Sequence, residues 1–148
     1  MVKITKSLVM EHAIFCAVFD QIEQILPGLN SVREVQVLTT IVEGLLGRHA
    51  NVEKDLAFAT LDHVLAEQGN LDRLHQDHRE LDRNYARVHD ANSLAQARRL
   101  LKMALAASRK HFRFEEREVF PLLERVLPGE TLADLGETRL QEYLSVNV

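Results

Sequence analysis

The sequence is poor in the residues that break helices, cross-link chains or span membranes. Only six glycines and three prolines interrupt its 148 residues, so long segments run without a helix breaker. The single cysteine, Cys16, excludes an intramolecular disulfide and favours a reducing compartment. No apolar run approaches the roughly 20 residues that a transmembrane helix needs, and the early polar residues Glu11 and His12 are unlike a signal-peptide core. We therefore expect a cytoplasmic protein with no membrane partner.

The chain also lacks tryptophan and any strong excess of basic residues. Its net charge is −4, and no basic cluster of the kind that binds nucleic acid stands out, so no nucleic-acid partner is expected. Hydrophobic residues make up 46% and charged residues 27%, which is the balance of an ordinary globular protein. A chain of this length can bury a core without disulfides. We expect one domain over residues 1–148.

Apolar residues recur at intervals of three and four, which indicates helices, and no segment alternates as a strand would. Four long helices are predicted over about 7–26, from 31 to the break at 69–70, over about 71–88, and over about 93–127. Turns at 27–28, 69–70 and 128–129 separate them, and a short C-terminal helix follows to about Tyr143. The short connections predict an all-α, antiparallel up-down-up-down four-helix bundle with a short C-terminal helix.

Local signals mark individual helix ends. Ser31, with Glu34 three residues later, predicts a capping box. Thr131 and Asp134 form a similar pair before the C-terminal helix. Pro121 lies inside the last long helix, which it should kink or end because proline lacks the backbone N–H.

An internal repeat carries the chemistry. The segments 49–65 and 111–127 align without a gap at an offset of 62 and share six identical residues, including His49 with His111 and Glu53 with Glu115. A weaker match at an offset of 66 pairs the predicted first and third helices, aligning Glu11-His12 with Asp77-His78. Residues four apart lie on one face of a helix. Each half of the chain therefore supplies one histidine and one His-x-x-x-Glu pair to the same layer of the bundle.

Four imidazoles and two carboxylates in one layer suit a pair of metal ions. Carboxylates can bridge two metals, imidazoles fill terminal positions, and the absence of thiolates argues against structural zinc or iron–sulfur sites. Buried carboxylates without partners would be costly, which favours bound cations. A lone histidine on a helix is usually an ordinary surface or core residue. Two His-x-x-x-Glu pairs in register, each with a histidine on the partner helix, are a much stronger signal.

The motifs resemble those of the hemerythrin-like, or HHE cation-binding, domains across nearly the whole chain. The matching segments are Met10-Glu11-His12, 49–53, 77–81 and 111–121, of which the last is the most specific. The resemblance implies a four-helix bundle with two iron ions, bridged by two carboxylates and an oxo or hydroxo group. It implies His12, His49, His78 and His111 as terminal ligands, and Glu53 and Glu115 as bridges.

One difference concerns the predicted third helix. Oxygen-carrying hemerythrin has a second histidine there, one turn earlier, and an aspartate as one bridge. Here the candidate seventh ligand is His75, three residues before His78, and the alternative is a histidine outside the cluster. Two further residues are candidates for contacts near the metals. Cys16 lies one turn beyond His12 and is otherwise a small buried side chain. Tyr85, seven residues after His78, either forms a hydrogen bond near the metals or packs in the core.

The resemblance leaves the use of the metals open. The first hypothesis is a non-heme di-iron protein that binds a small diatomic ligand, carrying oxygen or sensing oxygen, nitric oxide or iron. The second is a di-iron redox enzyme acting on peroxide or nitric oxide, or an iron donor for iron–sulfur cluster repair. The third is a structural or interaction protein with a vestigial site. The histidine-rich ligand set favours the first, so a non-enzymatic role is expected.

Overall fold

A computed structural model describes residues 1–59, 62–67 and 69–145. Within these residues the chain is helical and contains no strand. The elements, in order, are α1 (Ile4–Ile25), the short 3-10 turn η1 (Leu26–Gly28), α2 (Val32–Val52), the π-helical segment η2 (Glu53–Phe58), α3 (Asp62–Glu67), α4 (Asn70–His89), α5 (Leu94–Phe114), the π-helical segment η4 (Glu115–Val119), α6 (Phe120–Val126) and α7 (Gly129–Ser145). The prediction of an all-α bundle is confirmed.

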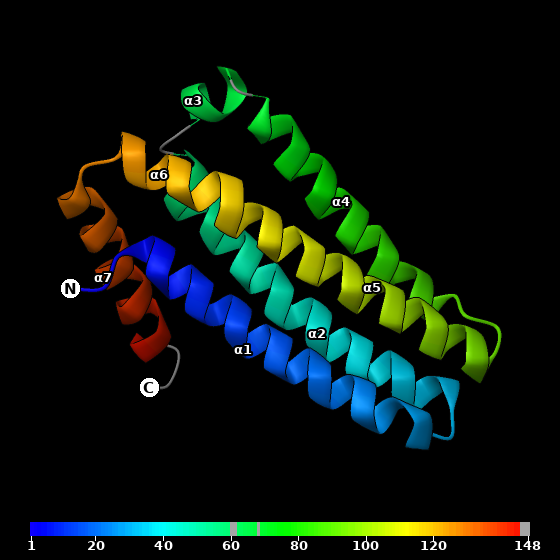
Figure 1. The fold of residues 1–148 in the computed structure, drawn as a ribbon. Coiled ribbons are helices and arrows are strands. Elements are labelled where there is room, and N and C mark those ends of the chain that lie inside the picture. The colour runs from blue at the N-terminus through cyan, green and yellow to red at the C-terminus, as the bar shows by residue number, and fades with distance from the viewer. Residues whose placement is uncertain (60–61, 68, 146–148) are drawn as a thin grey trace.

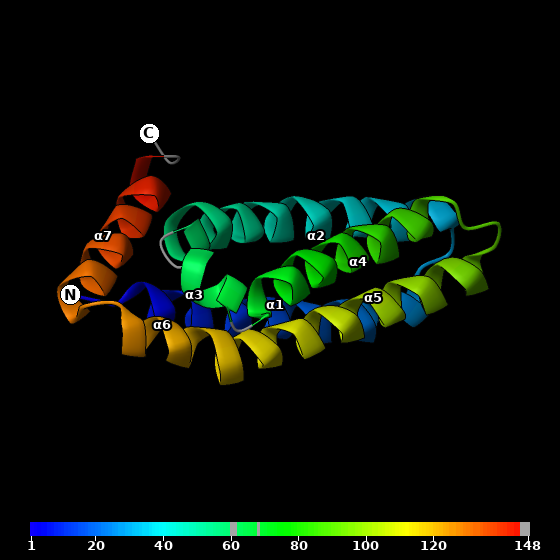
Figure 2. The same cartoon turned by 90° about the horizontal axis from the view of Figure 1, so that it is seen from above.

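The four long helices form two antiparallel hairpins that lie side by side (Figures 1 and 2). The α1–α2 and α4–α5 turns meet at one end, while α3, α6 and α7 gather at the other, where α7 packs beside the start of α1. Within the described part of the chain, no helix is long and apolar enough to cross a membrane.

Helix ends follow the predicted signals at most positions. Ser31 and Glu34 form the complete capping box, and Ser93 caps α5 by accepting a hydrogen bond from the Gln96 backbone N–H. Gly69, at the predicted break, has a φ of +73°, a left-handed conformation that favours glycine. The predicted Thr131–Asp134 cap is wrong, because α7 already begins at Gly129.

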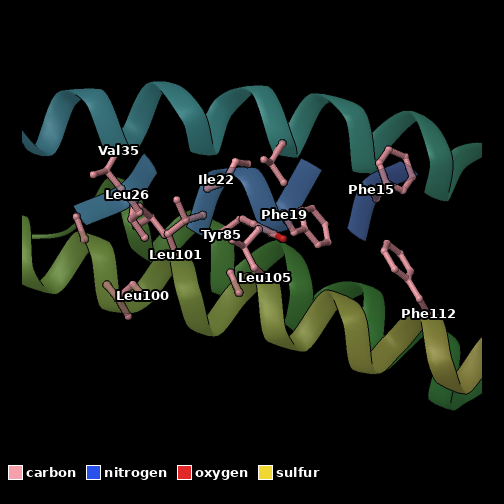
Figure 3. Close-up of a cluster of buried hydrophobic side chains, with 14 residues drawn as sticks. Phe15, Phe19, Ile22, Leu26, Val35, Tyr85, Leu100, Leu101, Leu105 and Phe112 are labelled. Atoms are coloured by element: carbon pink, nitrogen blue, oxygen red, sulfur yellow. The ribbon is translucent and has the colours of Figure 1, made fainter. Parts of the chain in front are cut away.

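Two hydrophobic clusters divide the bundle interior. One fills the turn end with side chains of α1, α2, α4 and α5; Figure 3 shows Leu26 and Val35 at one end of it, and Phe15 and Phe112 at the other. The second fills the opposite end and includes Leu8, Leu74 and Phe120. Between residues of the two clusters lie His12, between Leu8 and Phe15 on α1, and His78, between Leu74 and Tyr85 on α4. The polar layer is therefore held between two apolar layers that exclude water.

Candidate metal centre

Six of the predicted ligands converge between the two hydrophobic clusters. His12 comes from α1, His49 from the last turn of α2, His78 from α4 and His111 from the last turn of α5. Their ligand atoms, with those of the two glutamates, fall into two groups in which all atoms lie within 4.8 Å of one another. The groups are His12, His49 and Glu53, and Glu53, His78, His111 and Glu115.

Glu53 belongs to both groups. Its Oε1 lies 2.9 Å from His49 Nε2 and 3.6 Å from His12 Nε2, while its Oε2 lies 3.7 Å from His78 Nε2. Within the groups, the Nε2 atoms of His12 and His49 are 3.0 Å apart, and so are those of His78 and His111. The carboxylate thus directs one oxygen to each histidine pair, which is the arrangement of a bridging ligand.

Both glutamates are buried without the partners that a carboxylate normally has. Glu53 is 1% exposed and Glu115 is fully buried, and none of their four oxygens has a hydrogen-bond partner among the described residues. His111 Nε2 closely approaches Glu115 Oε1, but outside hydrogen-bond geometry. Buried polar atoms are nearly always satisfied, so four carboxylate oxygens without a hydrogen-bond partner in one layer call for another partner. A cation would compensate these oxygens, so the residues present fit a metal centre.

Both glutamates stand where an α-helix changes into a π-helix. The segment η2 begins at Glu53 and η4 begins at Glu115, so the repeat at an offset of 62 extends to the backbone. Single π-helical turns are rare and are often found at functional sites. Pro121 follows this segment directly, in the first turn of α6, where a proline is tolerated. The sequence predicted a kink near Pro121, but it gave no sign of a π-helical turn after His49.

Three acidic side chains that the sequence analysis did not select contact the outward nitrogens of the histidines. Glu11 Oε2 lies 2.5 Å from His49 Nδ1, Glu116 Oε1 lies 2.9 Å from His12 Nδ1, and Asp77 Oδ2 lies 3.3 Å from His111 Nδ1. A carboxylate at Nδ1 fixes the tautomer of a histidine and directs Nε2 to a metal. The alignment of Glu11-His12 with Asp77-His78 was the signal for two of these acids. In both hairpins, the acid contacts the His of the other helix.

In the metal-free protein, the histidines and glutamates of the two groups have unequal pKa values, because their surroundings differ. Burial lowers the pKa of His49, but the charge of Glu53 and the hydrogen bond to Glu11 outweigh it and raise the pKa to about 9. Burial and the neighbouring His78 instead lower the pKa of His111 to about 4. Burial and the charge of Glu53 raise the pKa of Glu115 well above its ordinary range. Burial opposes ionisation of Glu53, but His49 prevails and holds its pKa low.

The two groups also differ in their access to solvent. The side chains of His12 and His49 are 2% and 4% exposed, whereas that of His78 is 23% exposed. His12 stacks on Phe112 with ring centroids 4.1 Å apart. A cavity of about 370 Å³ lies beside the centre, and its lining includes His49 and Phe112 as well as Glu53, His78, His111, Lys54, Asp82, Tyr85 and Ser108. Because His78 is the most exposed of the four histidines, its side is the open side of the centre.

The repeat explains part of this difference. Glu116, which accepts a hydrogen bond from His12, aligns at the offset of 62 with Lys54, which lines the cavity. A lysine ammonium has no acceptor, so Lys54 cannot hold His78 as Glu116 holds His12.

The remaining candidates lie around the centre. His75 is exposed on α4 and belongs to neither group, so a seventh ligand stays a prediction. Tyr85 is buried with its hydroxyl 2.7 Å from Ser108 Oγ, and both residues line the cavity. Cys16 is a half-buried free thiol packed against the hydrophobic cluster that contains Phe15.

Comparisons with known proteins agree with this geometry. No match was found among curated proteins or among solved structures. The family model described as the hemerythrin HHE cation binding domain matches residues 3–123, a range that contains all six converging side chains and ends before α7. With that match over most of its length, the chain belongs to the hemerythrin HHE cation-binding domain family.

Proposed function

We propose that this protein holds two iron ions, joined by Glu53, and that the pair binds a small diatomic ligand. The single observation that carries the proposal is the position of Glu53, whose two oxygens face different histidine pairs. His12 and His49 would hold one ion, and His78, His111 and Glu115 the other. The set fits iron because it combines imidazole and carboxylate ligands without thiolates. Family resemblance adds Glu115 as a second bridge, with an oxo or hydroxo group.

Three features support a diatomic ligand on the open side. When bound, the iron pair would supply a redox-active site for oxygen or nitric oxide. His78 and His111 line the cavity, so a small molecule can reach them from it. The apolar clusters on both sides of the layer limit the access of bulk water, which would slow loss of a small ligand bound there.

Metal analysis tests the two-ion centre. Protein loaded anaerobically with ferrous ion should bind two equivalents per chain, and Glu53→Gln should lose at least one of them, since an amide cannot bridge two cations as a carboxylate does. Glu118→Gln is the matched control, because Glu118 lies exposed in η4. A Glu53→Gln protein that retains both equivalents would show that Glu53 does not join the ions.

Oxygen binding is then tested optically. The loaded protein should develop a charge-transfer band on admission of oxygen and lose it when oxygen is removed. Irreversible oxidation would refute reversible carriage.

The size of the cavity favours one alternative, a redox enzyme. A volume of about 370 Å³ exceeds the needs of a diatomic molecule and leaves room for a larger substrate beside His78. Steady consumption of peroxide or nitric oxide, abolished by His111→Ala, would favour this alternative over carriage or sensing. Stoichiometric transfer of iron to an acceptor without turnover would instead favour an iron donor.

A further inference from the structure

A line of polar contacts connects α7 to the candidate metal centre. Arg139, on α7, directs two nitrogens at Glu11 on α1: Nε lies 3.1 Å from Oε1 and Nη2 lies 3.5 Å from Oε2. Tyr143 donates its hydroxyl to Glu11 Oε1 at 2.8 Å and accepts a hydrogen bond from Arg139 Nη2 at 3.2 Å. Glu11 Oε2, in turn, contacts His49 Nδ1. A C-terminal helix outside the family match therefore reaches a candidate ligand through one carboxylate.

Burial makes this connection more than a surface ion pair. Glu11 is 6% exposed and Arg139 is 8% exposed, whereas exposed pairs contribute little because water screens them. The planar guanidinium matches both carboxylate oxygens, which fixes the orientation of the carboxylate as well as its charge. The orientation of Glu11 then decides where the His49 imidazole points.

Among the described residues, the other hairpin has no counterpart of Arg139. Asp77 aligns with Glu11 and contacts His111 Nδ1, but in the described part of the chain no Arg or Lys forms an ion pair with it. Its contact is longer, at 3.3 Å against 2.5 Å for Glu11. The two histidines that follow the same sequence pattern are thus held differently.

We propose that α7 contributes to the metal centre through Arg139, which acts as a positioning residue. Through the buried carboxylate of Glu11, Arg139 holds the His49 ring so that its Nε2 faces the position shared with His12. It therefore slows loss of the ion on that side and leaves the ion beside His78 unaffected. The inference rests on the proposed two-ion centre.

Packing of α7 does not depend on Arg139 alone. Leu132 belongs to the hydrophobic cluster at that end of the bundle, and Gly136 lies directly against the Val2 backbone. An Arg139 variant should accordingly keep α7 in place while releasing Glu11. Circular dichroism can confirm that the variant retains its helices.

The test measures release of the two metal ions to a chelator from protein loaded with cobalt(II), whose visible absorption follows the release. In Arg139→Gln, one ion should leave about 10- to 100-fold faster, the range typical of lost contacts to metal-binding histidines, and the other at the wild-type rate. Arg139→Lys keeps the positive charge but loses the planar guanidinium that contacts both oxygens of Glu11, so its release rate should be intermediate. This variant also provides the test if Arg139→Gln does not fold. Glu142→Gln is the control, since it removes only the exposed partner of Arg139 at 3.5 Å.

A double-mutant cycle separates positioning from general loosening of the bundle. If Arg139 acts through Glu11, adding Arg139→Gln to Glu11→Gln should cause no further acceleration. Asp77→Asn should accelerate the other ion, and its effect should add independently to that of Arg139→Gln. These two results identify which ion each variant releases.

The outcomes distinguish the two proposals. If wild-type protein binds fewer than two ions, the two-ion centre is overturned, together with the inference built on it. If wild-type binds two ions and Arg139→Gln releases both at wild-type rates, or speeds both equally, the two-ion centre stands and the role of α7 is overturned.

Discussion

Replacing Glu115 by glutamine should stabilise the metal-free protein, although Glu115 is proposed as a metal ligand. Glu115 is fully buried beside Glu53. Burial and the charge of Glu53 raise its pKa well above the ordinary value of 4.5, so the metal-free folded protein keeps this carboxyl protonated. An unfolded chain ionises the same group near pH 4.5. Folding above that pH must therefore take up a proton, which costs free energy.

The size and sign of the effect follow from proton linkage. A raised carboxyl pKa leaves stability intact below the unfolded value and removes about 1.4 kcal/mol for each pH unit above it, until the pH reaches the folded pKa. Glutamine has nearly the same shape and no ionisable group, so Glu115→Gln escapes this loss. The variant should match wild type near pH 4 and gain about 1.4 kcal/mol over the first pH unit above 4.5, with a further gain beyond.

Urea denaturation of chelator-treated protein at several pH values between 4 and 7 measures this difference. Glu118→Gln serves as the control, because Glu118 lies in the same segment but is exposed, and its effect should be small at every pH. With metal in excess, the order should reverse, since the variant lacks a ligand and gains less from binding. A metal-free Glu115→Gln protein that is no more stable than wild type at pH 6 or above would refute the electrostatic reasoning.

Three further predictions concern residues around the centre. In Gly136→Ala, the new Cβ would lie 1.9 Å from the Val2 carbonyl oxygen, so α7 must shift; we expect a loss of about 1–3 kcal/mol, measured by urea denaturation, and comparable stability would contradict the close packing. Asp77→Asn should weaken metal binding about tenfold or more on the His111 side, as measured by chelator competition, whereas unchanged competition would argue that this contact is unimportant. His75→Ala tests the predicted seventh ligand by elemental analysis: a lower metal content than in wild type would support it, whereas an unchanged content, in line with the exposure of His75 and its place outside both groups, would contradict it.

The sequence was sufficient for the fold because its signals were local. Helical periodicity and caps act within a few residues, so the Ser31 box and the Gly69 turn were readable without tertiary information. The errors are also local. At the start of α7, a plausible cap at Thr131 was not used, because the helix already begins at Gly129.

From the sequence, the residues of the candidate site could be predicted only where the internal repeat aligns them. The offset of 62 aligned His49 with His111 and Glu53 with Glu115, and the structure brings all four together with His12 and His78. The sequence did not predict that acidic side chains contact the histidine Nδ1 atoms, because charged residues are common on helices and these contacts depend on the neighbouring helix. Arg139 was still harder to foresee, since it is 128 residues from Glu11 in sequence and aligns with nothing in the repeat.

The two halves of the repeat differ in the contacts around their histidines, and these differences all favour the His12–His49 side. Glu116 holds His12 where Lys54, its counterpart, borders a cavity instead. Arg139 reinforces Glu11, while Asp77 has no such support in the described chain. Each difference strengthens the His12–His49 side or opens the other. A metal site that binds a further ligand must keep a position open, and carboxylates at Nδ1 orient the histidines that remain. Part of the asymmetry therefore lies outside the six converging side chains, in contacts that can change without altering those side chains themselves.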